Sequence, residues 1–432
     1  MTKAITLPLA TVLLLFAPMA SSGDQPSPVT LARFTVHAGA SDRLDTPVAA
    51  SLKGLETNPA GLRLQLYEVV GDERVPTASQ VDGDFAARLW WILAGPTPAG
   101  QTRLFELVRV PVAEAAPAEG TPGASSVDTT DDGEALTITL QDKPVLRYRY
   151  ATLPAPPGTS PLYARSGFIH PLWSPDGEVL TRVQPPDHYH HVGIWNPWTR
   201  TEFEGRKIDF WNLHDGQGTV RFKAFISTIT DEVYGGFRSL HEHVDLTAPD
   251  PSGAKVALNE EWQVRVWNVS PEADLWLIDF LSSLSCATPS PLVIKAYRYQ
   301  GFGFRATAAW DERTATLLTS EGEDQATGNA TRARWCDVRG PSKQGTAGAL
   351  FMTHPGNRDY PERMRIWPTG SNEGKENVFV NFNPAQESDW VLEPGRAHTL
   401  RYRILAYDGE LSPSEAERYW QDFAHPPTVT RE

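Results

Sequence analysis

Apolar and polar residues alternate along much of the chain with the period of two that is typical of half-buried β-strands. In the first part, Leu62, Leu64 and Leu66 illustrate the pattern, and turn-forming residues separate one such run from the next. We therefore predict a small β-sandwich domain over residues 28–112.

A change of composition follows this first part. Residues 113–134 contain no aromatic residue and are rich in Ala, Pro, Gly, Ser and acidic side chains. Such a segment cannot pack a core, so it is predicted to be a linker. From residue 135 to residue 425 the strand-like alternation resumes, as in Leu400, Tyr402 and Ile404.

The second part is long, almost entirely strand-like and rich in Gly and Pro turns, which predicts a large antiparallel sandwich or barrel. Helical spacing is convincing only near the end, where Ser412 can cap a short helix that continues to Trp420. The predicted fold class is all-β with few helices: a small N-terminal β-sandwich, a linker, and a large antiparallel β domain over residues 135–425.

The N-terminus has the pattern of a secretory signal peptide. In residues 1–22, Lys3 precedes an apolar run from Ala4 to Phe16, and small residues follow it. The run is too short to span a bilayer stably and contains Pro8. We predict export to the periplasm or the extracellular space, with no stable membrane insertion after cleavage; an uncleaved N-terminal anchor is the alternative.

Composition narrows the classes of partner. The 432 residues include 39 Lys+Arg and 53 Asp+Glu, and the net charge of −14 argues against nucleic acid as a partner. Cys286 and Cys336 are the only cysteines, so they form either one disulfide or two separate thiols. The 14 Trp indicate either an aromatic core or a surface that binds flat apolar faces with polar edges.

The densest group of polar and aromatic residues lies in residues 163–215, which contain five of the 11 His and four of the 14 Trp. Its centre is the run Asp187-His188-Tyr189-His190-His191. If this run is extended, His188 and His190 share one face and the other three residues share the opposite face. Two such imidazoles can bind a metal ion, or one can transfer protons while the other binds a hydroxyl group. The alternative is that these histidines have no chemical role and form hydrogen bonds to the backbone of a turn-rich segment.

A second His-x-His pair, His241 and His243, occurs in a strand-like context. It raises the alternative of a metal site, and a solvated strand edge is the other explanation. A cupin-like site needs a Glu four residues after the second His, where this chain has Ile194 and Thr247. We therefore predict no cofactor, and keep as the alternative a metal ion held by His188, His190, His241 and His243.

Candidate carboxylates for acid–base work are Asp209, between Ile208 and Phe210, and Glu261 in a Glu-Glu-Trp run. Apolar neighbours suggest burial, which raises a carboxyl pKa and suits a general acid or base. Arg305 follows a Gly-x-Gly segment and can anchor a carboxylate or vicinal hydroxyls.

The chain contains no G-x-S-x-G, P-loop, H-E-x-x-H or dinucleotide-binding fingerprint. Trp and Tyr beside His, Asp, Glu and Arg in an exported β-protein are typical of a sugar-binding site. In such a site aromatic faces pack on the sugar ring while polar groups bind the hydroxyls.

An ordered string of motifs also resembles a known bacterial family. The motifs are His170-Pro171-Leu172-Trp173-Ser174-Pro175-Asp176-Gly177, Asp187-His188-Tyr189-His190-His191-Val192-Gly193-Ile194-Trp195, Asp209-Phe210-Trp211, Gly301-Phe302-Gly303-Phe304-Arg305, Ala333-Arg334-Trp335 and His354-Pro355-Gly356-Asn357-Arg358. Over residues 145–410 the chain resembles the PmoA-type family, also labelled "methane oxygenase PmoA". The label is not an activity, because this chain has no apolar spanning segment after its signal. The resemblance implies a galactose-mutarotase-like β-supersandwich and a role in carbohydrate use.

The sequence as a whole predicts an exported carbohydrate-active protein, namely a sugar-processing enzyme of the hydrolase, lyase or epimerase type. His188 or His190 is the predicted general acid or base, with Glu261 or Asp209 as its partner. Predicted substrate-binding residues are Asp187, His191, Arg305, Trp195, Trp211, His170, Arg334, His354 and Asn357. The alternatives are a non-catalytic carbohydrate-binding protein and a metal-binding β-sandwich protein. The sequence gives no oligomeric state.

Overall fold

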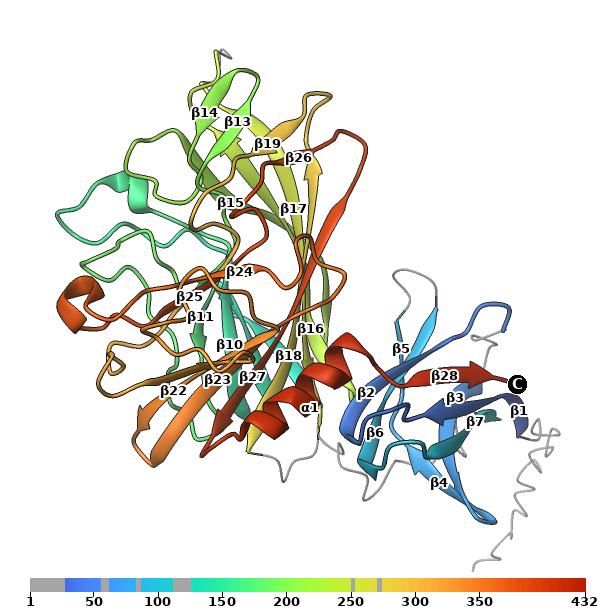
Figure 1. Ribbon diagram of the computed structural model, residues 1–432. Coiled ribbons are helices and arrows are strands. Elements are labelled where there is room, and N and C mark those ends of the chain that lie inside the picture. The colour runs from blue at the N-terminus through green and yellow to red at the C-terminus, as the bar shows by residue number, and fades with distance from the viewer. Residues whose placement is uncertain (1–27, 56–61, 83–86, 112–125, 250–252, 270–273) are drawn as a thin grey trace, which may run out of the picture.

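The structure is a computed structural model that describes residues 28–55, 62–82, 87–111, 126–249, 253–269 and 274–432. The predicted signal peptide lies outside the described residues, as does most of the predicted linker. These described residues form five sheets and one α-helix, and every strand pairing in them is antiparallel. Figure 1 shows the arrangement. The all-β prediction is confirmed. No helix in the described part of the chain is long and apolar enough to cross a membrane.

One eight-stranded sheet forms one side of the main core of the larger domain. In spatial order its strands are β15 (Gly218–Ile229), β16 (Tyr234–Asp245), β17 (Lys255–Trp267), β18 (Leu275–Cys286), β27 (His398–Asp408), β23 (Gly345–Thr353), β22 (Trp335–Ser342) and β21 (Thr316–Thr319). Its long strands alternate buried and half-buried residues, as the period-two pattern predicts.

A second eight-stranded sheet faces the first. Its strands, in spatial order, are β24 (Arg363–Ile366), β25 (Phe379–Asn383), β20 (Phe302–Arg305), β12 (Ile194–Trp195), β11 (Phe168–Leu172), β10 (Lys143–Arg149), β9 (Ala135–Leu140) and β8 (Val127–Asp131). A four-stranded sheet joins the same core, with the order β14 (Arg206–Ile208), β13 (Thr201–Phe203), β19 (Leu292–Ile294) and β26 (Trp390–Leu392).

Aromatic side chains from the two facing sheets fill the main core. Tyr148 of β10 packs against Trp262 of β17 at 6.0 Å between ring centroids, and Phe302 of β20 stacks on Tyr402 of β27 at 4.5 Å. Burial of such apolar surface is the dominant stabilising term in a β-sandwich. Much of the tryptophan excess is therefore structural.

The boundary of the linker prediction needs correction. Residues 127–131 form strand β8, although they fall within the predicted linker 113–134. Val127 is fully buried in the main core, because its neighbours on β9 supply the apolar partners that its own segment lacks. Composition alone therefore underestimated how far the larger domain extends toward the N-terminus.

Two smaller sheets pack face to face in the N-terminal part of the chain. One has the order β28 (Thr428–Arg431), β1 (Val29–His37), β7 (Thr102–Pro111), β3 (Leu62–Val70) and β4 (Glu73–Thr77), and the other has β2 (Arg43–Ser51), β6 (Arg88–Thr97) and β5 (Gln80–Asp82). Phe34, Phe105 and Trp91 fill the space between them. The last strand of the chain thus returns to pair with the first.

Helix α1 (Pro413–Ala424) lies between the two parts of the molecule (Figure 1). Ser412 caps it, as predicted; the cap is a capping box with Glu415, and the helix continues past Trp420. Its Asp422 accepts a hydrogen bond from the Arg43 guanidinium at 2.8 Å, and both residues are buried. The part of the chain that the structure describes also has the short 3-10 helices η2 (Pro161–Tyr163) and η3 (Ser371–Gly374).

The two cysteines are separate thiols rather than a disulfide. Cys286 ends β18 and donates to the Leu392 carbonyl at 3.1 Å, whereas Cys336 is buried within β22. Burial raises the pKa of the Cys336 thiol well above its ordinary value, so this thiol is unreactive.

Candidate functional site

The histidine-rich run lies in a tight loop between β11 and β12. A bridge between Val183 and Val192 closes the loop, and the His188 and His191 amides donate to the carbonyls of Pro185 and His188, each at 2.9 Å. The two prolines before Asp187 interrupt the strand pattern and favour these turns.

Gly193 fixes how this loop meets the sheet. Its φ of 66° lies in the left-handed region, and a Cβ atom at this position would come within 2.2 Å of the Ile169 carbonyl oxygen. Its own carbonyl accepts from the Arg305 amide at 2.9 Å. A glycine is therefore required for the loop to lie close against β11 and β20.

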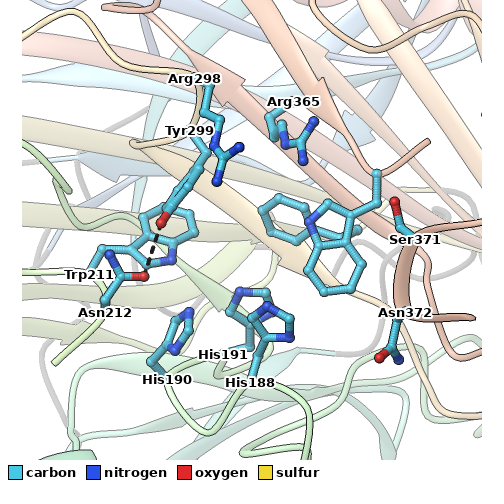
Figure 2. A pocket seen from close by; sticks show the side chains of 12 residues that line it. His188, His190, His191, Trp211, Asn212, Arg298, Tyr299, Arg365, Ser371 and Asn372 are labelled. Atoms are coloured by element: carbon cyan, nitrogen blue, oxygen red, sulfur yellow. Dashed lines mark hydrogen bonds between the residues drawn. The ribbon is translucent and has the colours of Figure 1, made fainter. Parts of the chain in front are cut away.

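The turns bring three imidazole rings to one side of the loop. The ring centroids of His188, His190 and His191 lie 4.7 to 5.4 Å apart. The prediction that His191 lies on the opposite face from His188 and His190 is wrong, because the backbone is turned rather than extended. Figure 2 shows the three rings grouped along one side of a cavity.

Asp187 orients the most accessible of these rings. Its Oδ2 atom lies 2.9 Å from His188 Nδ1 and accepts a second hydrogen bond from Arg305 Nη2 at 2.7 Å. Burial raises the pKa of this carboxyl, but the hydrogen bond from His188 and the charge of Arg305 outweigh it and lower the pKa to about 2. Since an ionised carboxylate only accepts hydrogen bonds, His188 Nδ1 carries a proton and Nε2 is left for the cavity.

The other two imidazoles are held neutral. Burial, reinforced by the nearby positive charges, lowers the pKa of His190 to about 3 and that of His191 well below its ordinary value. His191 Nδ1 lies 3.3 Å from Arg305 Nη1. A neutral imidazole both donates and accepts hydrogen bonds, which suits contact with sugar hydroxyls.

A short turn after β14 forms the next wall. The Asp209 carboxylate accepts from the backbone amides of Trp211 and Asn212 at 2.8 and 2.9 Å, and from the Asn212 side chain at 2.5 Å. This turn directs Trp211 and Asn212 to the cavity, where Asn212 Oδ1 accepts from the Tyr299 hydroxyl at 3.1 Å (Figure 2). Burial raises the pKa of Tyr299 to about 12, so its hydroxyl keeps its proton at neutral pH.

The cavity, which we call the histidine cavity, has a volume of about 360 Å³ and falls in the size range of small-molecule sites. Its lining residues are His188, His190, His191, Trp211, Asn212, Arg298, Tyr299, Arg365, Trp367, Ser371, Asn372 and Phe379. Aromatic rings and imidazole, amide, hydroxyl and guanidinium groups thus line one space.

Three predicted site residues support the cavity from behind rather than line it. Arg305 is fully buried and binds Asp187 and the Glu376 carbonyl, so it is not a free anchor for a substrate. Trp195 is also fully buried, 5.0 Å from the Trp211 ring. Asp209 holds the turn described above, so it serves as a positioning residue rather than as an acid–base partner.

The prediction that Glu261 is the partner of the histidines is wrong. Glu261 accepts from Arg238 Nε at 2.8 Å and lines a different cavity, between the two domains, which we call the interdomain cavity. Its neighbour Glu260 points to the opposite face of β17, because successive side chains of a strand alternate. The carboxylate that contacts a cavity histidine is Asp187, which was predicted to bind substrate.

Four further predicted binding residues lie outside the histidine cavity. His170 on β11 contacts the Thr181 hydroxyl at 2.9 Å, and Arg334 pairs with Glu321 at 3.1 Å. His354 lines the interdomain cavity, and Asn357 donates to the buried carboxyl of Glu362 at 2.8 Å. These residues belong to separate hydrogen-bond networks and do not line the histidine cavity with the loop histidines.

The alternative metal set does not assemble. His241 and His243 are fully buried in β16, where His241 Nε2 contacts the Tyr148 hydroxyl and His243 Nε2 lies 2.9 Å from Glu260 Oε2. They lie neither at a solvated strand edge nor in the histidine cavity. Among the described residues, no group of three or more His, Cys, Asp or Glu is arranged to hold a metal ion.

Sequence reasoning missed most of the wall opposite the histidines. The residues it did not name as site residues are Asn212, Arg298, Tyr299, Arg365, Trp367, Ser371, Asn372 and Phe379. Asn212 directly follows the Asp-Phe-Trp motif and Tyr299 precedes the Gly-x-Gly segment, so proximity to those motifs is a usable signal. Arg365 and Trp367 carry no such signal, because only the pairing of β24 with β25 brings them to the cavity.

A family model matches residues 135–421 and is described as a family of unknown function, DUF6807. The chain belongs to this family. The whole histidine cavity falls inside the DUF6807 region, whereas strands β1 to β8 precede it.

No curated protein matches the chain. Two solved structures are similar at 8% sequence identity: a protein in glycosyl hydrolase family 38 from Enterococcus faecalis, with a TM-score of 0.40, and an α-mannosidase from Enterococcus faecalis V583, with a TM-score of 0.43. The similarity covers 93% of this chain in both cases, and 47% and 46% of those chains. This DUF6807 chain therefore spans about half the length of each.

Proposed function

We propose that the protein is an exported carbohydrate-active enzyme in which His188 transfers a proton to or from a sugar bound in the histidine cavity. The observation that carries the proposal is the Asp187–His188 pair, joined at 2.9 Å, at the edge of a cavity with aromatic and hydrogen-bonding walls. A carboxylate that fixes the tautomer and orientation of a histidine is a recurrent arrangement for general acid–base catalysis.

The cavity walls support a sugar as the ligand. The half-buried Tyr299 and Trp367, which is 9% exposed, line the cavity with aromatic rings for the C–H faces of a pyranose. His190, Asn212 and Asn372 supply neutral donors and acceptors for hydroxyl groups. The combination of a few fixed polar groups with an aromatic lining is what gives small-molecule sites their orientation and specificity.

Proton abstraction is the part of sugar chemistry that these groups fit best. Hydrolysis by glycosidases uses two carboxyl groups across the scissile bond. The carboxylates expected for that task are used elsewhere, Asp209 in a turn and Glu261 with Arg238. We therefore favour β-elimination or epimerisation, in which His188 Nε2 takes a proton from carbon and the Tyr299 hydroxyl is placed to give one.

Export and the PmoA-type resemblance belong to the same proposal. The charged, apolar and small-residue order of residues 1–22 supports export. Three of the motif segments that carry the resemblance also meet at or directly behind the histidine cavity, through His188, Trp211 and Arg305.

The test is turnover of a panel of neutral and acidic oligosaccharides, followed by ultraviolet absorbance of unsaturated products and by nuclear magnetic resonance for epimers. We expect His188→Ala to lower turnover about 10²–10⁴-fold, which is the usual contribution of a general acid or base. His37→Ala, in strand β1 of the N-terminal sandwich, is the matched control and should leave turnover unchanged.

Two results would count against this function. If His188→Ala retained full turnover, the assignment of the proton-transfer group would be wrong. If the wild-type protein bound sugars but converted none, it would be a carbohydrate-binding protein, and the enzymatic part of the proposal would fail.

A further inference from the structure

Two arginines face the histidine cavity without an acidic partner. Arg298, in the segment before β20, is exposed, and Arg365 on β24 is half-buried; both line the cavity. Figure 2 shows their guanidinium groups on the side of the cavity opposite His188, His190 and His191. In the described part of the chain, neither arginine forms an ion pair.

Their surroundings hold both guanidinium groups in place without neutralising them. The Arg298 guanidinium lies 5.6 Å from the centre of the Tyr299 ring. Arg365 Nη1 donates to the neutral Asn329 side chain at 2.8 Å, and its buried Nε has no hydrogen-bond partner. Burial and the charge of Arg298 both lower the pKa of Arg365, so the two cations repel each other.

Two neighbouring arginines, in contrast, have an acidic partner. Arg363, two residues before Arg365, pairs with Glu387 at 2.6 Å, and Arg332 pairs with the same carboxylate at 2.6 Å. In a chain with a net charge of −14, carboxylates are abundant. A pair of unneutralised arginines in a cavity is therefore a local positive field within an acidic protein.

We propose that the sugar is acidic, and that its anionic group binds between Arg298 and Arg365. This inference rests on the proposed function, since it names the substrate class of the same cavity. Guanidinium groups bind planar or tetrahedral oxyanions through paired charge-assisted hydrogen bonds, which neutral hydroxyls cannot match. The oxyanion is the carboxylate of a uronic acid or the sulfate ester of a neutral sugar, which share this chemistry.

The arrangement also fits the proton chemistry proposed for the site. The arginines and His188 lie on opposite sides of the cavity, so the carbon that bears the carboxylate of a bound uronate lies between them (Figure 2). Pairing of a uronate carboxylate with cations stabilises the negative charge that develops when the adjacent carbon loses its proton. In elimination, the C–H electron pair becomes the new C=C bond while the bond between the next carbon and the leaving-group oxygen breaks. That oxygen leaves with the bonding pair and takes a proton from the Tyr299 hydroxyl. In epimerisation only the C–H bond breaks, and the carbon takes a proton on its opposite face.

The experiment is isothermal titration calorimetry of the full chain with three matched sugars: uronate oligosaccharides, their neutral methyl esters, and sulfated neutral oligosaccharides. We expect at least one anionic sugar to bind about 10–100-fold more tightly than its neutral counterpart. Arg298→Gln should weaken that binding by a similar factor and leave the fold intact, because Arg298 is exposed and its guanidinium contacts the Tyr297 and Tyr299 rings rather than an acidic side chain.

Arg396→Gln is the control, because it removes the same charge from a separate groove that also contains Arg358 and Arg401. Its binding should match that of the wild type, which separates a specific site from general attraction by positive charge. Tighter binding of the uronate assigns the carboxylate, and tighter binding of the sulfated sugar assigns the sulfate ester.

If neither the uronate nor the sulfated sugar bound more tightly than the neutral methyl ester, the inference would be overturned and the proposed function would stand. Equal loss in Arg298→Gln and Arg396→Gln would also overturn it. If no sugar of any kind bound or turned over, the proposed function itself would fail.

Discussion

The chain contains two His-x-His pairs with the same spacing, of which one lines a cavity and the other is buried in the core. His188 and His190 lie in a loop, beside a cavity of about 360 Å³. His241 and His243 lie in strand β16, fully buried between the two large sheets. The spacing of two residues therefore says little about chemistry; the surroundings decide which pair can meet a ligand.

The two pairs also differ in how their carboxylate partners are used. Asp187 contacts His188 from the side and leaves the imidazole Nε2 unused. Glu260, in contrast, takes hydrogen bonds from Asn196, Ser282 and Trp262 on Oε1, at 2.6 to 2.7 Å, and from His243 on Oε2. A carboxylate with this many donors stabilises the fold rather than binding a ligand, because its lone pairs are already occupied.

The largest expected difference between the pairs is in stability. Glu260→Ala removes the acceptor for four buried donors, so we expect the free energy of unfolding to fall by about 3–5 kcal/mol, the usual cost of breaking a buried pair. Chemical denaturation followed by tryptophan fluorescence measures this change.

His188→Ala supplies the comparison, because His188 is about one-third exposed and lies beside a cavity. Its free energy of unfolding should change by less than about 1 kcal/mol. If His188→Ala were as destabilising as Glu260→Ala, the loop pair would be structural too, and the contrast between the two regions would disappear.

The fold was largely predictable because it depends on alternation. Period two along β17 and β27 predicts which residues enter the core, and the structure places Trp262, Leu400 and Tyr402 there. The site was less predictable for a physical reason: its walls come from segments as far apart as His188 and Phe379, joined only by sheet pairing. Side-chain type predicted the histidine loop, but the turned backbone inverted which residues share a face.

The second expected difference is in the pH dependence of stability. Burial lowers the pKa of His241 to about 4, while an unfolded histidine titrates near 6.5. Between these values the unfolded chain binds a proton that the folded chain does not. The stability that the neutral His241 contributes to the fold is therefore fully present above pH 6.5 and is lost as the pH falls toward 4.

This pH effect is measured as the slope of the unfolding free energy between pH 6.5 and 4. One such group contributes up to about 1.4 kcal/mol per pH unit, and His190 and His191 add to the slope with the same sign. We expect His241→Gln to reduce the slope by up to that amount. An unchanged slope in His241→Gln would contradict the lowered pKa of His241.

The smallest expected effect is that of Glu261→Gln on the free energy of unfolding, compared with a substitution of the adjacent Glu260. Glu261 was predicted to be the catalytic partner, but it faces the interdomain cavity, about 29% exposed, and pairs with Arg238 at 2.8 Å. Ion pairs at such exposure contribute about 0–1 kcal/mol, so Glu261→Gln should change the free energy of unfolding by no more than that and leave turnover unchanged. Glu260→Ala, one residue away, is the comparison, because Glu260 lies on the buried face of the same strand. A loss of turnover of tenfold or more in a stably folded Glu261→Gln protein would place the chemistry in the interdomain cavity, beside His354 and Arg403, and would remove the histidine loop from its central role.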